Sequence, residues 1–175
     1  MLKELLFEIY EQIKNCMANG EVEVLTEIDS RETPTGTKRN ILLNRAKGKY
    51  AVFIDSDDYI YPYYVREILK AAESDCDCMA INGLYTENGL KETKWFISKD
   101  NGYCASKDEN GKEIFLRYPN HITIIKSSIA KQFKFPDIYH GEDYVWATAL
   151  HNSGLIKTET KIDKPLYHYK YISNK

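Results

Sequence analysis

The sequence lacks several features that would point to a class of protein at once. Its four cysteines have no Cys-x-x-Cys spacing, so neither a zinc knuckle nor a disulfide framework is indicated. No Asn-x-Ser/Thr sequon occurs, and no apolar run approaches the length of a membrane span. Residues 1–14 carry charges every two or three positions, which is not the pattern of a signal peptide. These absences together favour a reducing cytoplasm.

The sequence also lacks an excess of either charge. Its 24 basic and 26 acidic residues are interspersed and leave a net charge of -2, so no nucleic-acid-binding face is expected. Over 175 residues, 43% are hydrophobic and 29% are charged, which is typical of a globular protein. This length is sufficient for one domain with a substantial core, and we expect a single domain over residues 1–175.

Hydrophobic periodicity predicts helices and strands in alternation. Helices are expected over residues 2–18, 38–46, 63–72, 126–133 and 141–153. Strands are expected over residues 21–28, 50–54, 121–125, 155–162 and 165–171, with a hairpin over 78–97 that turns at Asn88-Gly89. Residues 98–113 are polar and rich in glycine, so we expect a surface excursion there. The alternation in the first half predicts an α/β layered domain with a largely parallel sheet.

Three acidic residues stand directly after the apolar run 50–54: Asp55, Asp57 and Asp58. A run that is apolar on both faces indicates a buried strand, and α/β sheets bind ligands at the carboxyl ends of such strands. Mg²⁺ binds carboxylate and phosphate oxygens and often takes only one or two carboxylates from the protein. The alternative is a plain turn, because Asp and Ser are common in turns and N-caps. The motif alone leaves both interpretations open.

The segment around these acids, KRNILLNRAKGKYAVFIDSDDYIYP (38–62), resembles the central block of family 2 glycosyltransferases with the GT-A fold. Three further segments resemble blocks of the same family: EVEVLTEID, HGEDYVWATALHNSG and PLYHYKYISNK. The likeness covers nearly the whole chain. It implies an α/β domain of the GT-A fold, with a mixed, mostly parallel sheet flanked by helices. Residues 1–85 would form the half that binds the nucleotide sugar, and residues 86–175 the acceptor-side half.

The resemblance implies a nucleotide-diphospho-sugar donor, with a UDP-sugar as the first expectation, and Mn²⁺ or Mg²⁺ as the cofactor. The donor-binding residues would be Asp29, Arg39, Asp55, Asp57 and Lys170. The metal ligands would be Asp57, Asp55, Asp58 and His168. The ion would offset the negative charge that grows on the diphosphate as the sugar leaves.

Two acids at the start of a predicted helix, Glu142 and Asp143, are the candidate catalytic residues. By the resemblance, Asp143 before Glu142 would take the proton of the acceptor hydroxyl, on a carbohydrate or another molecule, and one such displacement would invert the anomeric centre. The alternative is that both acids merely cap the helix and complement its dipole. His121, His140 and His151 are expected to be structural.

The sequence departs from the family at its start, because the family has an apolar strand before the first helix, whereas Met1-Leu2 lie in that helix. A second copy or a partner chain could complete the sheet. Two alternatives to a transferase therefore stay open. One is a non-catalytic remnant that binds nucleotide sugars. The other is a haloacid-dehalogenase-like phosphatase with Asp55 as nucleophile, although Tyr59 stands where that family usually has Thr or Val.

Overall fold

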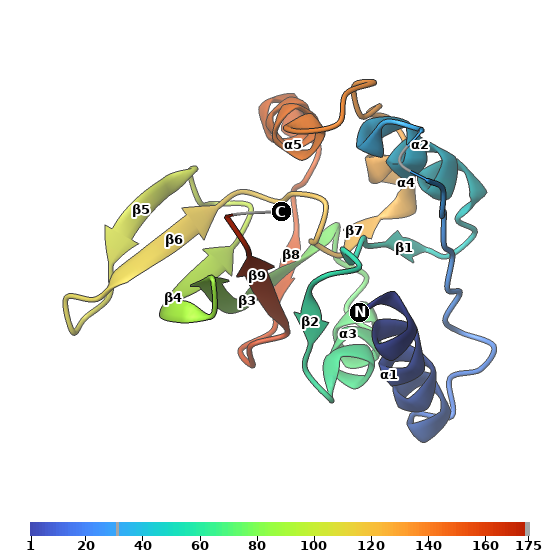
Figure 1. Ribbon diagram of the computed structural model, residues 1–175, viewed down its shortest axis with the longest axis horizontal. Helices are drawn as coiled ribbons and strands as arrows, with labels where there is room; N and C mark the ends of the chain where they lie inside the picture. Colours follow the sequence, from blue (N-terminus) through green and yellow to red (C-terminus); the bar gives the residue numbers. More distant parts are fainter. Residues whose placement is uncertain (31, 174–175) are drawn as a thin grey trace.

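A mixed β-sheet with helices packed against it forms the structure, a computed structural model that describes residues 1–30 and 32–173 (Figure 1). The strands of the described residues are β1 Tyr50–Ala51, β2 Tyr59–Ile60, β3 Cys78–Glu87, β4 Leu90–Ile97, β5 Cys104–Lys107, β6 Glu113–Arg117, β7 Ile125–Lys126, β8 Glu159–Lys161 and β9 Tyr167–Tyr171. The main path through the sheet is β1-β7-β3-β4-β6-β5, with β8 and β9 attached to β3, and β2 attached to β9. The sheet therefore converges on β3.

Strand β3 is central because nearly every side chain at its start is buried. Cys78, Met79, Ala80 and Ile81 are each at most 5% exposed, and the strand pairs with β4 and β7 antiparallel and with β8 and β9 parallel. Across the described residues, five strand pairings are antiparallel and three are parallel. The sheet is mixed, as expected, but parallel pairs do not predominate.

The helices lie in two groups (Figure 1). The first group, α1 Leu2–Asn15 and α3 Tyr64–Ala72, packs together and contributes Leu5, Ile9 and Val65 to one hydrophobic core. The second group, α2 Thr35–Arg45, α4 Ser127–Ala130 and α5 Glu142–Ser153, surrounds a second core that contains Trp146. No helix of the described residues is both long enough and apolar enough to cross a membrane.

The hairpin predicted at Asn88-Gly89 is confirmed. Asn88 and Gly89 have φ angles of 51° and 73°, and both residues connect β3 directly to β4. Two positive φ angles at the centre of a two-residue loop are what an Asn-Gly turn accommodates at least cost. The antiparallel β3–β4 pair that results forms much of the surface next to the cleft described below.

The strand predicted over residues 21–28 does not form. None of the backbone–backbone hydrogen bonds of the described residues involves residues 23–28, and the predicted strand 50–54 is reduced to β1. Of residues 52–54, Phe53 alone donates such a bond, from its N–H to the carbonyl oxygen of His121 at 3.0 Å. An alternating sequence becomes a strand only when a neighbouring strand supplies hydrogen-bond partners. Among the described residues the segment 23–28 has no such partner, and the run 50–54 has one only where β1 pairs with β7 and where Phe53 meets His121.

The excursion predicted over residues 98–113 is more ordered than expected. Strand β5 within it pairs antiparallel with β6, and Asp108 organises the connecting turn. One Asp108 carboxylate oxygen accepts hydrogen bonds from the N–H groups of Asn110 and Lys112, both at 2.9 Å. The sequence did not predict this hairpin. All four side chains of β5 are exposed, so the strand has no alternation of apolar and polar residues.

Candidate active site

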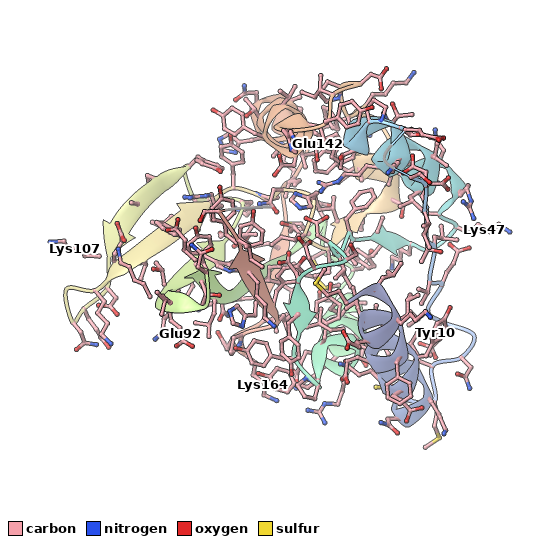
Figure 2. All side chains as sticks on the ribbon, in the orientation of Figure 1. Tyr10, Lys47, Glu92, Lys107, Glu142 and Lys164 are labelled. Atoms are coloured by element: carbon pink, nitrogen blue, oxygen red, sulfur yellow. The ribbon has the colours of Figure 1, made fainter. Side chains whose placement is uncertain are left out.

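A cleft of about 900 Å³ opens where the run 50–54 ends. Its charged and histidine side chains come from four parts of the chain: α2, the loop that follows residue 54, the segment 117–121, and residues 140–143 at the start of α5. We call six of them the charged set: Arg39, Asp55, Asp57, His121, Glu142 and Asp143. Figure 2 labels Glu142 at the beginning of α5, on the side toward α2. The fold thus brings together acids that lie almost 90 positions apart in the sequence.

Arg39 joins two of these acids. Its Nη2 lies 2.9 Å from Oδ1 of Asp55 and 3.4 Å from Oε1 of Glu142. The Arg39 side chain is 8% exposed, and its guanidinium carbon lies 5.7 Å from the ring centres of both Phe53 and Phe135. A buried guanidinium between two carboxylates is held in place by charge-assisted hydrogen bonding, so α2 fixes the acids from one side.

Asp55 is ionised in this setting. Burial alone would raise the pKa of its carboxyl group, but the hydrogen bonds and charges of His121 and Arg39 outweigh that effect and hold the pKa well below its usual range. The backbone N–H of Asp55 also donates to the Tyr167 hydroxyl at 3.1 Å. Asp55 is therefore anchored on every side that the described residues offer, and both its carboxylate oxygens already have partners.

Asp58 has a different environment, although it lies only three positions further on. The Tyr167 hydroxyl donates to its Oδ2 at 2.6 Å and the backbone N–H of Lys170 donates to its Oδ1 at 2.9 Å. Burial raises the pKa of Asp58 to about 7, against the lowering effect of these two hydrogen bonds. Both oxygens hold strand β9, so a role as metal ligand would require these contacts to break.

Glu142 and Asp143 occupy the first turn of α5, whose N-cap is Gly141 with a φ of 80°. No side-chain hydrogen bond caps this helix, so neither acid acts as its N-cap, although both lie where the positive end of the helix dipole favours a carboxylate. The Glu142 side chain is 5% exposed and paired with Arg39, whereas the Asp143 side chain is 37% exposed and lines the cleft. Asp143 is thus the more accessible of the two acids.

His121 was expected to be structural, and the structure places it in the cleft instead. Its Nε2 lies 3.2 Å from Oδ2 of Asp55, and its Nδ1 lies 3.4 Å from Oδ2 of Asp143. The sequence carries no signal for this arrangement, because a lone histidine in an apolar stretch is commonly a packed residue. Only the fold of residues 118–124 against the end of the run 50–54 brings the imidazole between two acids.

Three residues predicted to bind the donor or the metal lie outside the lining of the cleft. Asp29 accepts hydrogen bonds from the backbone N–H of Thr33 and from the Lys38 ammonium group, close to the start of α2. His168 lies 3.0 Å from the Thr86 hydroxyl, and burial lowers its pKa with the charge of Lys170 as a smaller cause. The Lys170 ammonium group lies 5.3 Å from the ring centre of Tyr59.

The fit of a divalent ion depends on Asp57. In the described residues, no group of three His, Cys, Asp or Glu side chains is arranged to hold a metal ion. Asp55, Asp57 and Asp58 all line the cleft, and Asp57 is half-buried there; the oxygens of Asp55 and Asp58 hold Arg39, His121 and strand β9. These residues fit an ion that takes one or two carboxylates from the protein and its other ligands from a diphosphate and water, which is the habit of Mg²⁺.

An aromatic surface that the sequence did not reveal completes the cleft. We call it the aromatic set; its members are Tyr85, Trp95, Tyr103, Phe115 and Tyr169. Tyr85 lies at its centre, with ring centres 5.7 Å from Phe115 and 5.6 Å from Tyr169. Arg117 stacks over Tyr103, with its guanidinium carbon 4.0 Å from the ring centre. Four of these rings come from β3, β4, β6 and β9 and the fifth, Tyr103, from the residue before β5, so no local pattern could predict the set.

The fold defines the class of protein. The crystal structure of TarS 1–349 from S. aureus is similar over 94% of this chain and 47% of that one, with 18% sequence identity and a TM-score of 0.58. Its complex with UDP-GlcNAc is similar over 97% of this chain and 47% of that one, with 17% identity and a TM-score of 0.61. The α/β domain with a mixed sheet and a cleft at a strand end is thus of the GT-A type.

The family follows from the sequence itself. Residues 11–136, well over half of the chain, match Glycosyl transferase family 2, and the chain belongs to that family. EpsH of Bacillus subtilis (strain 168), to which glycosyltransferase activity is ascribed, is 24% identical over 148 residues, which cover 77% of this chain and 41% of EpsH. The chain therefore spans less than half of the length of these relatives.

Proposed function

We propose that the cleft transfers a sugar from a nucleotide-diphospho-sugar donor to a hydroxyl group of an acceptor. The observation that carries this proposal is the convergence of Arg39, Asp55, Asp57, Glu142 and Asp143 in one cleft. The family and the GT-A fold support the same reaction class. A phosphatase is less well supported, because both oxygens of its would-be nucleophile, Asp55, are engaged by Arg39 and His121.

The proposed donor is a UDP-sugar. TarS 1–349 has been crystallised with UDP-GlcNAc and with UDP, which makes these two molecules the first probes to test on this chain. Asp29, Arg39, Asp55, Asp57 and Lys170 remain the proposed donor-binding residues. Asp29 and Lys170 would have to meet the donor from outside the present lining of the cleft.

The proposed cofactor is Mn²⁺ or Mg²⁺, held by Asp57 with Asp55, Asp58 and His168 as further proposed ligands. When bound, the ion would neutralise the charge that develops on the departing diphosphate. Three of the four, Asp55, Asp57 and Asp58, line the cleft directly after the run 50–54, at the strand end where α/β sheets bind ligands, whereas His168 lies outside the lining. Arg39 supplies a fixed positive charge at the same end of the cleft.

Asp143 is the proposed general base, and it would take the proton of the acceptor hydroxyl as that oxygen attacks the sugar. Its greater exposure, compared with the buried Glu142, favours this assignment. Glu142 instead forms an ion pair with Arg39, which holds the start of α5 in place. One displacement assisted by one base would invert the configuration of the anomeric carbon.

The proposed acceptor is a carbohydrate. The aromatic set borders the charged set in the same cleft, and tyrosine rings combine a flat apolar face with a hydroxyl group that can bond to sugar hydroxyls. Tyr103 and Tyr169 are 51% and 41% exposed, so their rings are open to a ligand. The cytoplasm remains the proposed compartment, in line with four cysteines that are all free thiols.

A second copy or a partner chain that completes the sheet is also proposed. A cavity of about 430 Å³ lies between α1, α3 and the two extended segments 21–26 and 50–54, and its lining is mainly apolar. Protein interiors seldom leave so large a volume empty, and the backbone of residues 23–28 lacks hydrogen-bond partners among the described residues. Hydrogen exchange of amides 23–28 and sedimentation of the isolated chain test this proposal. A chain that sediments as a monomer and whose amides 23–28 exchange as fast as those of an unfolded peptide would contradict it.

The test of the proposed function is binding and turnover of UDP-GlcNAc with and without Mn²⁺. We expect a thermal shift on binding and release of UDP, with turnover lowered about 10²–10⁴-fold in Asp143→Asn because a general base contributes about that much. Glu142→Gln is the comparison variant for the neighbouring acid. Binding of UDP with no turnover of any nucleotide sugar would support the non-catalytic alternative, and a folded sample that binds none would contradict both.

A further inference from the structure

We propose that His121 is a positioning residue that fixes the base Asp143 relative to Asp55; this inference rests on the proposed function of the cleft. Each ring nitrogen of His121 faces one carboxylate: Nε2 is hydrogen-bonded to Asp55 Oδ2 at 3.2 Å, and Nδ1 lies 3.4 Å from Asp143 Oδ2. Nδ1 is buried and makes no hydrogen bond among the described residues, so Asp143 is the nearest carboxylate to an otherwise unsatisfied nitrogen. The imidazole side chain is only 10% exposed, so it is clamped between the acids and does not swing freely in solvent. It forms a direct link between the donor side and the base.

His121 closes a ring of polar side-chain contacts. Arg39 connects Asp55 to Glu142 on one side, and His121 connects Asp55 to Asp143 on the other. Glu142 and Asp143 are consecutive in α5, so the ring ties the first turn of this helix to the end of the run 50–54 at two points. These two contacts add to the core packing of Trp146 and Leu150, which already holds the body of α5, and they act on its first turn, where the acids lie.

The backbone around His121 is built to hold it. Its carbonyl oxygen accepts a hydrogen bond from the Phe53 N–H at 3.0 Å, two residues before Asp55. Asn120 and Thr123 bond reciprocally across it: the Asn120 N–H donates to the Thr123 hydroxyl oxygen, and the Thr123 N–H donates to the Asn120 carbonyl oxygen, both at 3.0 Å. These contacts fix the turn that carries the imidazole.

The same segment is attached to α5 independently of the charges. The Tyr118 hydroxyl lies 2.7 Å from the Thr148 hydroxyl, and the Tyr118 ring stacks on His151 with ring centres 4.5 Å apart. Both partners belong to α5. The His121 segment and the helix that bears the base are therefore packed directly against each other, and the contact of the imidazole with Asp143 concerns only the direction of that carboxylate.

The consequence for catalysis concerns the second oxygen of Asp143. Its Oδ2 faces Nδ1 of His121 at 3.4 Å, close but without hydrogen-bond geometry, whereas its Oδ1 takes part in none of the hydrogen bonds or ion pairs found among the described residues. A carboxylate held at one oxygen presents the other in a fixed direction, which is what proton removal from an acceptor hydroxyl requires. Misplacement of a reacting group by about 1 Å can cost about 10²-fold in rate.

Two substitutions separate the contacts of His121. In His121→Asn the amide nitrogen takes the place of Nδ1 and can still reach Asp143, whereas in His121→Gln it takes the place of Nε2 and can reach only Asp55. With UDP-GlcNAc and Mn²⁺ as probe, we expect kcat for UDP release to fall about 10–100-fold in His121→Gln, with KM and the affinity for UDP unchanged. His121→Asn should retain most of the wild-type kcat.

The outcomes distinguish the inference from the function on which it rests. A wild-type chain that turns over no nucleotide sugar refutes the proposed function, and His121 then has no base to position. An active wild type in which His121→Gln keeps its kcat, or in which His121→Asn loses as much as His121→Gln, overturns this inference alone. Ring ¹⁵N spectra add a readout without turnover: Asp143→Asn should shift the Nδ1 resonance of His121, and an unshifted resonance contradicts the link.

Discussion

Strand β3 and the segment 21–28 differ more in structure than in sequence. Both contain apolar residues with β-branched or aromatic side chains, and both were predicted to be strands. Strand β3 pairs with four other strands and is buried over its first four residues, whereas residues 23–28 have no backbone–backbone hydrogen bond among the described residues. A local alternation of apolar residues is therefore not sufficient for a strand, which also needs neighbouring strands to pair with.

The largest difference between the two regions is expected in their response to truncation. Met79 in β3 is fully buried, so Met79→Ala should lower the free energy of unfolding by about 2–5 kcal/mol through lost burial and a residual cavity. Val24 is half-buried beside the cavity of about 430 Å³, so Val24→Ala should lower the free energy of unfolding by less than about 1 kcal/mol. Urea denaturation of both variants measures the two values. Equal losses would mean that the segment 21–28 is packed as firmly as β3.

A second contrast involves glycine. A Cβ atom added at Gly83 in β3 would lie 2.0 Å from the backbone oxygen of Tyr167 and 2.4 Å from the Trp95 ring. Gly83→Ala should therefore destabilise the chain by about 1–3 kcal/mol, because overpacking forces β9 or Trp95 to move. Gly102→Ala is the matched control, since nothing lies within 4 Å of its added Cβ. Thermal denaturation of both variants measures the difference, and a stable Gly83→Ala would show that β9 is loosely attached.

The third prediction concerns pH and the junction between β3 and β8. Burial raises the pKa of Asp77, but hydrogen bonds from the backbone of Lys157 and Thr158, with smaller contributions from the Thr158 hydroxyl and Lys126, outweigh burial and hold this pKa below its ordinary value. A lowered pKa means that Asp77 stabilises the fold above its unfolded pKa, about 4, and that this stabilisation is lost as the pH falls through the folded value. Asp77→Asn should cost about 1–2 kcal/mol at pH 7.

That cost should shrink as the solution is acidified toward pH 3. Urea denaturation at pH 7, 5 and 3 checks it, with the wild type measured at each pH as the reference. A cost that stays constant with pH would show that packing rather than charge holds this junction together.

The smallest effect is expected in the segment 21–28 itself. Glu27 pairs with Arg45 at 3.1 Å, with side chains 30% and 52% exposed respectively. Exposed pairs of this kind contribute about 0.2–1 kcal/mol, so Glu27→Gln should lower stability by no more than that and less at high salt. Denaturation at low and high ionic strength measures the effect. A loss of several kcal/mol would contradict the view that surface contacts hold this segment weakly.

Local elements whose signals do not depend on distant partners were predicted correctly. The helices α1 and α5 and the hairpin at Asn88-Gly89 follow from apolar spacing, glycine stops and turn chemistry within a few residues. Strand β5 was missed because its exposed side chains carry no alternation. The segment 21–28 was predicted to be a strand because it does alternate, and it fails because its partners must come from elsewhere in the fold.

The site divides in the same way. The acids Asp55, Asp57, Glu142 and Asp143 could be selected from short motifs and from the likeness to a family, and the fold places all four in one cleft. His121 and the aromatic set could not, since each depends on contacts between positions tens of residues apart. His168 and Lys170 were selected by the same resemblance, yet they lie outside the lining of the cleft and stay proposals.

The sequence alone determined the family, the α/β class and the candidate acidic residues of the site, because each can be recognised from short stretches of consecutive residues. The tertiary structure alone decided which apolar segments become strands, which carboxylates remain accessible, and which histidine lies between Asp55 and Asp143. The physical reason is that hydrogen-bond partners, burial and charge pairing are properties of neighbours in space. A residue type sets what a side chain can do, and its neighbours set which of those roles it can fill.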